Sequence, residues 1–235
     1  DQVTWMDVRV GELVVTPRHG KPVEINALWY NALHILERLS IEFGEEYKVY
    51  SKLVTKVKKS FNDKFWNEEK QCLYDVVDEY DDKIRPNQIW AVSLPFSILD
   101  EDKERKVVET VYKHLYNTYG LRSLSYMEDG YKGKYIGKLI DRDCAYHMGT
   151  TWGFLIGGFI TAYCKVNNHS KEAIKRANEM CCIFQDHMRD GCINGIAEIF
   201  DGDFPSTGRG CYSQAWSVAE VLRAYAVEVY PYLEK

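Results

Sequence analysis

The stretch Thr150–Val166, TTWGFLIGGFITAYCKV, decides the fold class of this chain. It is mostly apolar, it contains glycines, and it is long enough for several helical turns. A helix that is apolar on all sides must be covered by the rest of the protein. We therefore expect this segment to form a helix that is buried on most sides.

Helical spacing of apolar residues recurs on both sides of this segment. Pro22 suits the start of a helix and Gly44 its end. Ser170 is a typical N-cap for the segment that follows the central helix. Including the central helix, the pattern predicts seven helices, at residues 22–44, 45–65, 85–99 (with Pro95 as a kink), 101–116, 150–166, 170–189 and 213–229.

The segments between these helices alternate between short turns and long polar loops. Residues 1–20 are expected to form a loop with short extended pieces, and Leu73–Asp78 a short strand. Residues 119–149 are expected to be irregular, and a loop of that length is uncommon unless it is functional. The pattern predicts one all-α domain over residues 1–235, with its long loops gathered at one end of a helical toroid.

Composition excludes several classes of function. The chain has 235 residues, 46% of them hydrophobic and 28% charged, which is typical of a globular protein. Its net charge of −5 offers no footprint for nucleic acid or an anionic membrane, and no apolar run is long enough to span a bilayer. Seven cysteines without a C-x-x-C pair suggest buried thiols in a reducing, cytoplasmic compartment. Because the first residue is Asp1, we expect a portion of a longer protein.

The loop before the last helix, Ile193–Trp216, concentrates chemistry-bearing residues: Glu198, Asp201, Asp203 and Arg209. Glu198 stands between apolar neighbours, and a carboxylate in such a setting commonly has a dedicated partner. The alternatives are a solvated acidic turn or a short strand with Glu198 pointing outward. Asp201-Gly202-Asp203 resembles the start of a calcium loop, but Pro205 stands at the next ligand position. We expect no metal and no cofactor.

Two further clusters are candidates to face this loop. Asp7 lies in T-W-M-D beside Trp5, and Asp143 lies in I-D-R-D-C-A-Y-H with Arg142 and His147. Glycoside hydrolysis needs two carboxyl groups on either side of the scissile bond. An aspartate such as Asp7, taken alone, is more often a turn or helix-cap residue. Asp143 and His147 are spaced either for an acid–base pair or for a structural hydrogen bond.

Several motifs together resemble the α-1,6-glucosidase domain of bacterial and archaeal glycogen debranching enzymes. They are T-W-M-D, V-V-T-P-R-x-G-K-P-V-E-I-N-A-L-W-Y-N-A-L (Val14–Leu33), L-Y-D-V-V-D (Leu73–Asp78), R-P-N-Q (Arg85–Gln88), Y-G-L-R-S-L (Tyr119–Leu124), R-D-C-A-Y-H-x-G-T (Arg142–Thr150), E-I-F-D-G-D (Glu198–Asp203), R-G-C (Arg209–Cys211) and Q-A-W-S-V-A-E-V-L-R (Gln214–Arg223). The resemblance covers nearly the whole chain in order. Thr151–Phe154 departs from the bulkier, proline-containing sequences of that family.

The resemblance implies a six-hairpin α/α toroid that hydrolyses α-1,6-linked glucose at branch points of glycogen or limit dextrin, with inversion. Asp7 would be the general acid and Glu198 the general base. The full toroid has twelve helices and an additional N-terminal domain. This chain would therefore be the C-terminal portion of an opened ring, inactive by itself if the missing helices complete the pocket. Its apolar faces would seek a partner such as a second copy of the chain.

The remaining candidates are residues for binding the branched α-glucan. Three tryptophans are candidates for stacking on sugar rings, or else for the core: Trp5, Trp29 and Trp152. Six polar residues are candidates for contacts with sugar hydroxyls: Arg18, Arg142, Asp143, His147, Asp201 and Arg209. Arg209 equally suits the orientation of Glu198 or of an aspartate in its own loop.

Two rival functions remain open at this point. One is another enzyme on the same scaffold, either a different exo-glycosidase or a sugar epimerase, and the epimerase would need paired histidines facing the pocket. The other is a non-catalytic glycan-binding module, which would have aromatic platforms without opposed carboxylates.

Overall fold

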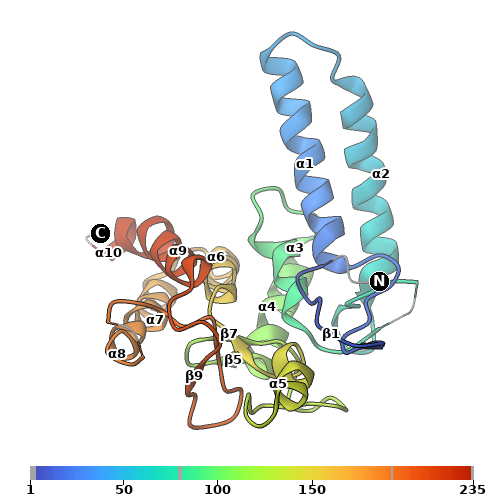
Figure 1. Ribbon diagram of the computed structural model, residues 1–235. Helices are drawn as coiled ribbons and strands as arrows, with labels where there is room; N and C mark the ends of the chain where they lie inside the picture. Colours follow the sequence, from blue (N-terminus) through green and yellow to red (C-terminus); the bar gives the residue numbers. More distant parts are fainter. Residues whose placement is uncertain (1–3, 79–80, 192, 234–235) are drawn as a thin grey trace.

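A computed structural model describes residues 4–78, 81–191 and 193–233 (Figure 1). The helical elements are α1 (Val23–Glu42), α2 (Lys48–Phe65), η1 (Pro86–Ile89), α3 (Trp90–Ser93), α4 (Glu101–His114), α5 (Leu139–Tyr146), α6 (Leu155–Val166), α7 (Lys171–Cys182), α8 (Phe184–His187), α9 (Ala215–Ala224), η2 (Tyr225–Val229) and α10 (Tyr230–Leu233). The strands are β1 (Arg9–Val10), β2 (Leu13–Val14), β3 (Trp66–Asn67), β4 (Cys72–Leu73), β5 (Tyr116–Asn117), β6 (Gly120–Arg122), β7 (Thr151–Trp152), β8 (Ile199–Phe200) and β9 (Gly208–Arg209). The predicted helical fold is confirmed.

Helix α6 is the centre of the packed body. Nine of its residues are buried, and it contacts α3, α4, α7 and α9. Gly157 allows the close approach of α9, because a Cβ at this position would overlap the backbone oxygen and side chain of Glu220. The prediction of a central buried helix is confirmed, although the helix begins at Leu155 rather than at Thr150.

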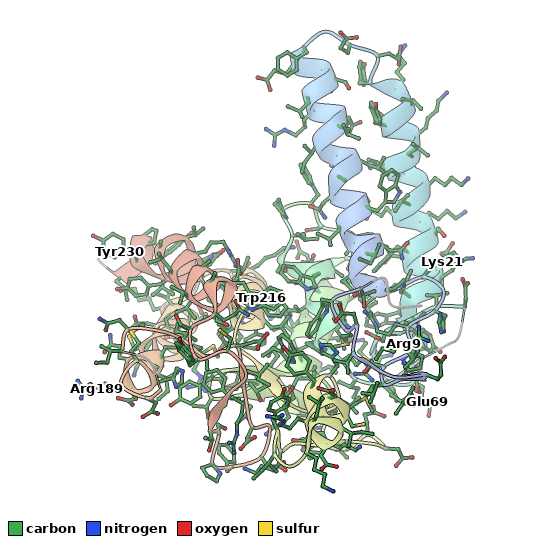
Figure 2. All side chains as sticks on the ribbon, in the orientation of Figure 1. Arg9, Lys21, Glu69, Arg189, Trp216 and Tyr230 are labelled. Carbon is green, nitrogen blue, oxygen red and sulfur yellow. The ribbon has the colours of Figure 1, made fainter. Side chains whose placement is uncertain are left out.

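Helices α1 and α2 form an antiparallel hairpin that projects from this body (Figure 1). The buried residues of α1 end at Leu33, and those of α2 are Phe61 and Phe65 near its end. Residues 34–60 contain no buried residue in the described chain. Figure 2 shows the side chains of this far part lying against the two helices or pointing away from them.

The body also contains a five-stranded antiparallel sheet that the sequence did not predict. Its order is β5-β6-β7-β8-β9, with Leu121 opposite Trp152, Trp152 opposite Ile199, and Ile199 opposite Arg209. The sheet joins the end of α4, the start of α6 and the loop before α9. It therefore fixes the position of the acidic loop that contains Glu198.

Three boundaries predicted from the sequence were wrong. The helix expected over 85–99 ends at Ser93, because Leu94 is extended before Pro95, where a helical conformation is disfavoured. The expected strand Leu73–Asp78 is only the two residues of β4, Cys72–Leu73. The supposedly irregular segment 119–149 contains β6 and α5. Ser170, in contrast, caps α7 as predicted and accepts a hydrogen bond from the Ala173 amide.

Among the helices of the described ranges, none combines the length and the apolar character needed to cross a membrane. Residues 1–3 of the expected N-terminal loop lie outside the described residues.

Candidate active site

Glu198 lies directly before β8, at the end of the sheet. Its backbone amide donates to the Cys211 carbonyl over 2.8 Å, which extends the pairing of β8 with β9. Its half-buried carboxylate accepts three hydrogen bonds. The Tyr146 hydroxyl donates to Oε1 at 2.6 Å, the Gln214 amide donates to Oε1 at 3.3 Å, and the Cys211 backbone amide donates to Oε2 at 3.0 Å. Glu198 therefore has the dedicated partners expected of a carboxylate among apolar neighbours.

Tyr146 is the last residue of α5 and donates a hydrogen bond to Glu198. Burial, the hydrogen bond to Glu198 and the charge of Glu198 raise the pKa of the Tyr146 phenol well above its usual range. The charges of Tyr135 and Asp7 raise this pKa further. Asp7 thus contributes to the electrostatic environment of the phenol that binds Glu198.

The two residues before Asp7 anchor it. The Trp5 indole donates to the Asn87 side-chain oxygen over 2.7 Å, and Met6 is completely buried. Asp7 itself is exposed, and the strand that follows it, β1, packs against α5. The local sequence T-W-M-D thus buries Met6, partly buries Trp5 and leaves the Asp7 carboxylate exposed.

An aromatic cluster joins Trp5, two residues before Asp7, to Tyr146, which binds Glu198. The Trp5 ring makes edge contacts with His147, Trp152 and Phe154 at 5.0 to 5.3 Å, and Phe154 stacks on Trp216 at 4.2 Å. Trp152 is only 2% exposed, and its indole donates to the Tyr146 carbonyl. Trp152 is therefore in the core, whereas Trp5 remains partly exposed at the edge of the cluster.

His147 is completely buried within the same cluster. Neither of its ring nitrogens has a hydrogen-bond partner among the described residues, so the expected bond to Asp143 is not formed. Burial, together with the charges of Arg85 and Arg18, lowers the pKa of His147 to about 3. This imidazole is consequently neutral at physiological pH.

Arg18 is part of a buried ionic network. It is 4% exposed and donates hydrogen bonds to both carboxylate oxygens of Glu24 and both of Asp75, and a further one to the Thr4 hydroxyl. These bonds use all of the donor groups of a guanidinium. In this structure, Arg18 fastens the N-terminal loop to α1 and to the loop after β4.

Asp201 and Arg209 form an ion pair inside the acidic loop. Arg209 donates to both carboxylate oxygens of Asp201, which is 1% exposed and also accepts from the Tyr135 amide. We expected Arg209 to orient either Glu198 or an aspartate of its own loop. The structure shows the second arrangement, because Arg209 binds Asp201. Asp203 accepts from the Tyr131 hydroxyl and helps to hold the same loop against residues 131–135.

The other predicted residues lie on two different helices, Arg142 and Asp143 on α5 and Trp29 on α1. Arg142 and Asp143 are partly exposed on α5, and the Arg142 guanidinium lies 6.0 Å from the Tyr135 ring. Trp29 is half exposed on α1, and the described structure gives it no contact with the group around Glu198.

Sequence reasoning did not single out Tyr146 and Gln214, which contact Glu198 directly. Both belong to motifs that carried the family resemblance, but nothing in their local sequence identifies Glu198 as their partner. Only the motifs that contain Tyr146, Glu198 and Gln214, taken together, could have indicated that these residues belong to one site.

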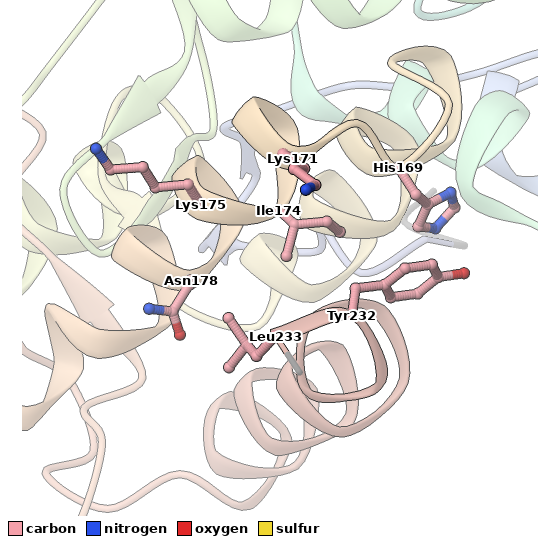
Figure 3. Close-up of a pocket in the computed structure, with 7 residues that line it drawn as sticks. All are labelled: His169, Lys171, Ile174, Lys175, Asn178, Tyr232 and Leu233. Atoms are coloured by element: carbon pink, nitrogen blue, oxygen red, sulfur yellow. The ribbon is translucent and has the colours of Figure 1, made fainter. Parts of the chain in front are cut away.

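Two hollows lie outside this group. One, of about 500 Å³, lies between α7 and α10, and its lining contains lysines but no carboxylate (Figure 3). The other, of about 490 Å³, is lined by Ala197, Arg209, Gly210 and neighbouring residues, and so adjoins the segment that holds Glu198. Neither contains an opposed pair of carboxylates.

Comparison with known proteins identifies the family. The model of the amylo-α-1,6-glucosidase family matches residues 1–223. A search of curated proteins gives no match.

Solved structures confirm the fold. The chain is similar to the GH63 mannosylglycerate hydrolase of Thermus thermophilus in complex with glucose, with a TM-score of 0.62 and 13% identity over 87% of this chain and 47% of that one. It is also similar to the neutral trehalase Nth1 of Saccharomyces cerevisiae, with a TM-score of 0.66 and 12% identity over 87% and 37%. A sialidase matches with a TM-score of 0.70 and 16% identity over 93% and 21%. The chain thus spans less than half the length of these proteins. It belongs to the amylo-α-1,6-glucosidase family and has the architecture of part of an α/α-toroid glycoside hydrolase.

Proposed function

We propose that this chain carries the catalytic carboxylates of an inverting α-1,6-glucosidase that removes glucose from branch points of glycogen or limit dextrin. The observation that carries the proposal is the Glu198 carboxylate held by three hydrogen-bond donors, one of which, Tyr146, also has its pKa raised by the charge of Asp7 from a distant segment. The family match supports the same substrate class.

In the proposed reaction, Asp7 is protonated and Glu198 is ionised. Asp7 gives its proton to the glycosidic oxygen, which leaves with the electron pair of the breaking bond to the anomeric carbon. Glu198 takes a proton from a water whose oxygen forms the new bond to that carbon from the opposite face. Asp7 ends deprotonated and Glu198 protonated, and the configuration is inverted.

The accessibility of each carboxylate suits its proposed role. Asp7 is exposed, so a bulky branched glucan can approach it. Glu198 is half buried and held by three donors, which favours a fixed position for the attacking water. Trp5, Arg142 and Asp143 are the predicted sugar-binding residues that this arrangement retains, because they lie close to it and are partly exposed.

The two rival functions have less support. Within the described residues, His147 is buried and His187 accepts from the Ala197 amide, so these histidines do not form the pair that an epimerase needs. A glycan-binding module would not need a carboxylate held by three donors, as Glu198 is. The six described cysteines are free thiols, which supports a reducing compartment such as the cytoplasm.

The test is the release of free glucose from a branched limit dextrin. We expect Asp7→Asn and Glu198→Gln each to lower kcat by about 10²–10⁴-fold, the usual contribution of a general acid or base. Glu12→Gln is the matched control, since its carboxylate lies in the same loop with a side chain that is 99% exposed. Full activity of either site variant would exclude the proposed mechanism. A structure with a glucose-like inhibitor should place the two carboxyl groups roughly 6.5–9.5 Å apart.

A further inference from the structure

The three hydrogen bonds to Glu198 are unequally divided between its two oxygens. Tyr146 and Gln214 both donate to Oε1, whereas only the Cys211 backbone amide donates to Oε2. Each oxygen of a carboxylate has about two acceptor sites. The described partners therefore occupy both sites of Oε1 and leave one site at Oε2.

We propose that Tyr146 is a positioning residue which, together with Gln214, reserves Oε1 and makes Oε2 the atom that accepts the proton from water. This inference rests on the proposed function and goes beyond it, because it assigns the base to one atom. It also gives roles to two residues that do not contact the substrate.

Tyr146 is rigid enough for this role. Its carbonyl accepts hydrogen bonds from the Thr150 hydroxyl and the Trp152 indole, which fix the end of α5. Its ring packs edge-on against Trp152 at 4.7 Å and also contacts His147 and Tyr135. A ring fixed by packing on several sides can hold a carboxylate without losing side-chain entropy during the reaction.

Gln214 is fixed at both ends of its amide. Its side-chain oxygen accepts from the Ala215 amide at the start of α9, which leaves the nitrogen to donate to Glu198. Its backbone amide also donates to the Ile196 carbonyl, in the segment that leads to Glu198. The orientation of the amide group therefore follows from its two partners.

Gly210 provides space on the Oε2 side. It has a φ of +66°, and a Cβ at this position would overlap Oε2 of Glu198. The absence of a side chain allows the carboxylate to lie against the backbone of residues 210–211. Tyr146 and Tyr135 are both influenced by the charge of Glu198, Asp7 acts on Tyr146, Arg142 and Asp143 act on Tyr135, and Cys211 is the titratable residue whose amide binds Oε2.

The kinetic test is Tyr146→Phe in the full chain, with limit dextrin as the substrate. We expect kcat to fall at least tenfold with KM unchanged within twofold, because the base is misplaced while substrate contacts remain. We also expect the acidic limb of the kcat profile to move to higher pH, since a hydrogen bond to a carboxylate favours its ionised form. In the Glu198→Gln background, the same change should lower kcat less than twofold.

The matched control is Tyr119→Phe. Tyr119 stacks on Phe200 of β8 at 4.6 Å, and no hydrogen bond of its hydroxyl is found in the described structure. The Tyr119→Phe substitution therefore removes one phenol hydroxyl near β8 and leaves the contacts of Glu198 in place. We expect it to leave kcat, KM and the pH profile as they are.

A second measurement does not depend on turnover. In ¹³Cζ-tyrosine NMR spectra, with the Tyr146 resonance assigned from Tyr146→Phe, Glu198→Gln should allow this phenol to ionise at lower pH than in the wild type. Unchanged ionisation would contradict the contact.

The outcomes separate the two proposals. If Asp7→Asn and Glu198→Gln lose activity but Tyr146→Phe keeps its kcat and pH profile, the positioning role is wrong and the proposed function stands. If the carboxylate variants of the intact enzyme keep their rate, both the proposed function and the kinetic role of Tyr146 are wrong. An equal loss from Tyr146→Phe in both backgrounds would mean that Tyr146 acts independently of Glu198.

Discussion

At the scale of single residues, the environment of His147 is unusual for a group that titrates near neutral pH. The imidazole is enclosed by aromatic rings, and two arginines lie near enough to disfavour its charged form. It belongs to the motif that also contributes Tyr146. Its burial supports the end of α5 and thereby the position of the phenol at Glu198.

This burial predicts a pH dependence of stability. The pKa of His147 is lowered to about 3 in the folded chain, from about 6.5 when unfolded. The neutral ring thus contributes stability that is present above pH 6.5 and is lost as the pH falls toward 3. We expect the free energy of unfolding to decrease by about 2 kcal/mol between pH 7.5 and pH 5 from this group.

The comparison is with His147→Phe, which keeps an aromatic ring and cannot be protonated. Urea unfolding at the two pH values should show a smaller decrease in the variant by about the same 2 kcal/mol. NMR of the wild-type ring should show no titration above pH 5, and a midpoint near 6.5 would contradict the assignment. The NMR measurement remains decisive if the variant fails to fold.

At the scale of elements, α6 packs against its neighbours through two adjacent glycines in different settings. A Cβ at Gly157 would overlap Glu220 of α9, whereas a Cβ at Gly158 would meet Ser93 and Trp90 at 3.5 to 3.7 Å, an ordinary van der Waals distance. Both glycines are buried in the same helix. Packing therefore requires a glycine at position 157 but not at position 158.

This difference predicts opposite effects of the same substitution. We expect Gly157→Ala to destabilise the chain by about 1–3 kcal/mol, because α9 must move away. Gly158→Ala should be neutral or stabilise by up to about 1 kcal/mol, since alanine favours the helix. Urea unfolding of both variants measures this, and equal effects would mean that α9 does not pack on Gly157 in solution.

The elements also show what sequence can and cannot predict. Helices α1, α2 and α4 follow from local apolar spacing and end signals, and all three were predicted within a few residues. The five-stranded sheet was missed because each strand has only two or three residues and pairs with a segment far along the chain. Tyr146 was missed for the same reason, since its partner Glu198 is 52 positions away.

At the scale of the whole molecule, the packed body and the projecting hairpin of α1 and α2 differ in how much they bury. Nine residues of α6 are buried, whereas the far part of the hairpin, residues 34–60, has none. Its outer face instead exposes apolar side chains: Ile35, Leu36, Leu39, Ile41 and Phe43. Little within the described chain therefore stabilises this part against local opening.

Hydrogen exchange measures this contrast directly. Local opening free energies in a protein range from about zero to the global value, according to how many contacts each segment buries. At low micromolar concentration, we expect the amides of residues 34–60 to exchange much faster than those of α6. Residues 23–33, which are anchored by buried side chains such as Leu33, should exchange at intermediate rates.

The matched substitutions Leu33→Ala and Leu36→Ala test the same gradient by stability. Leu33 is 1% exposed and Leu36 is 39% exposed on the same helix. The first should cost about 2–5 kcal/mol, as for a buried leucine, and the second much less. Slow exchange of residues 34–60, together with a large loss of unfolding free energy in Leu36→Ala, would contradict the weak stabilisation of this part of the hairpin. If that protection rose with protein concentration, a second copy of the chain would be covering the exposed apolar face.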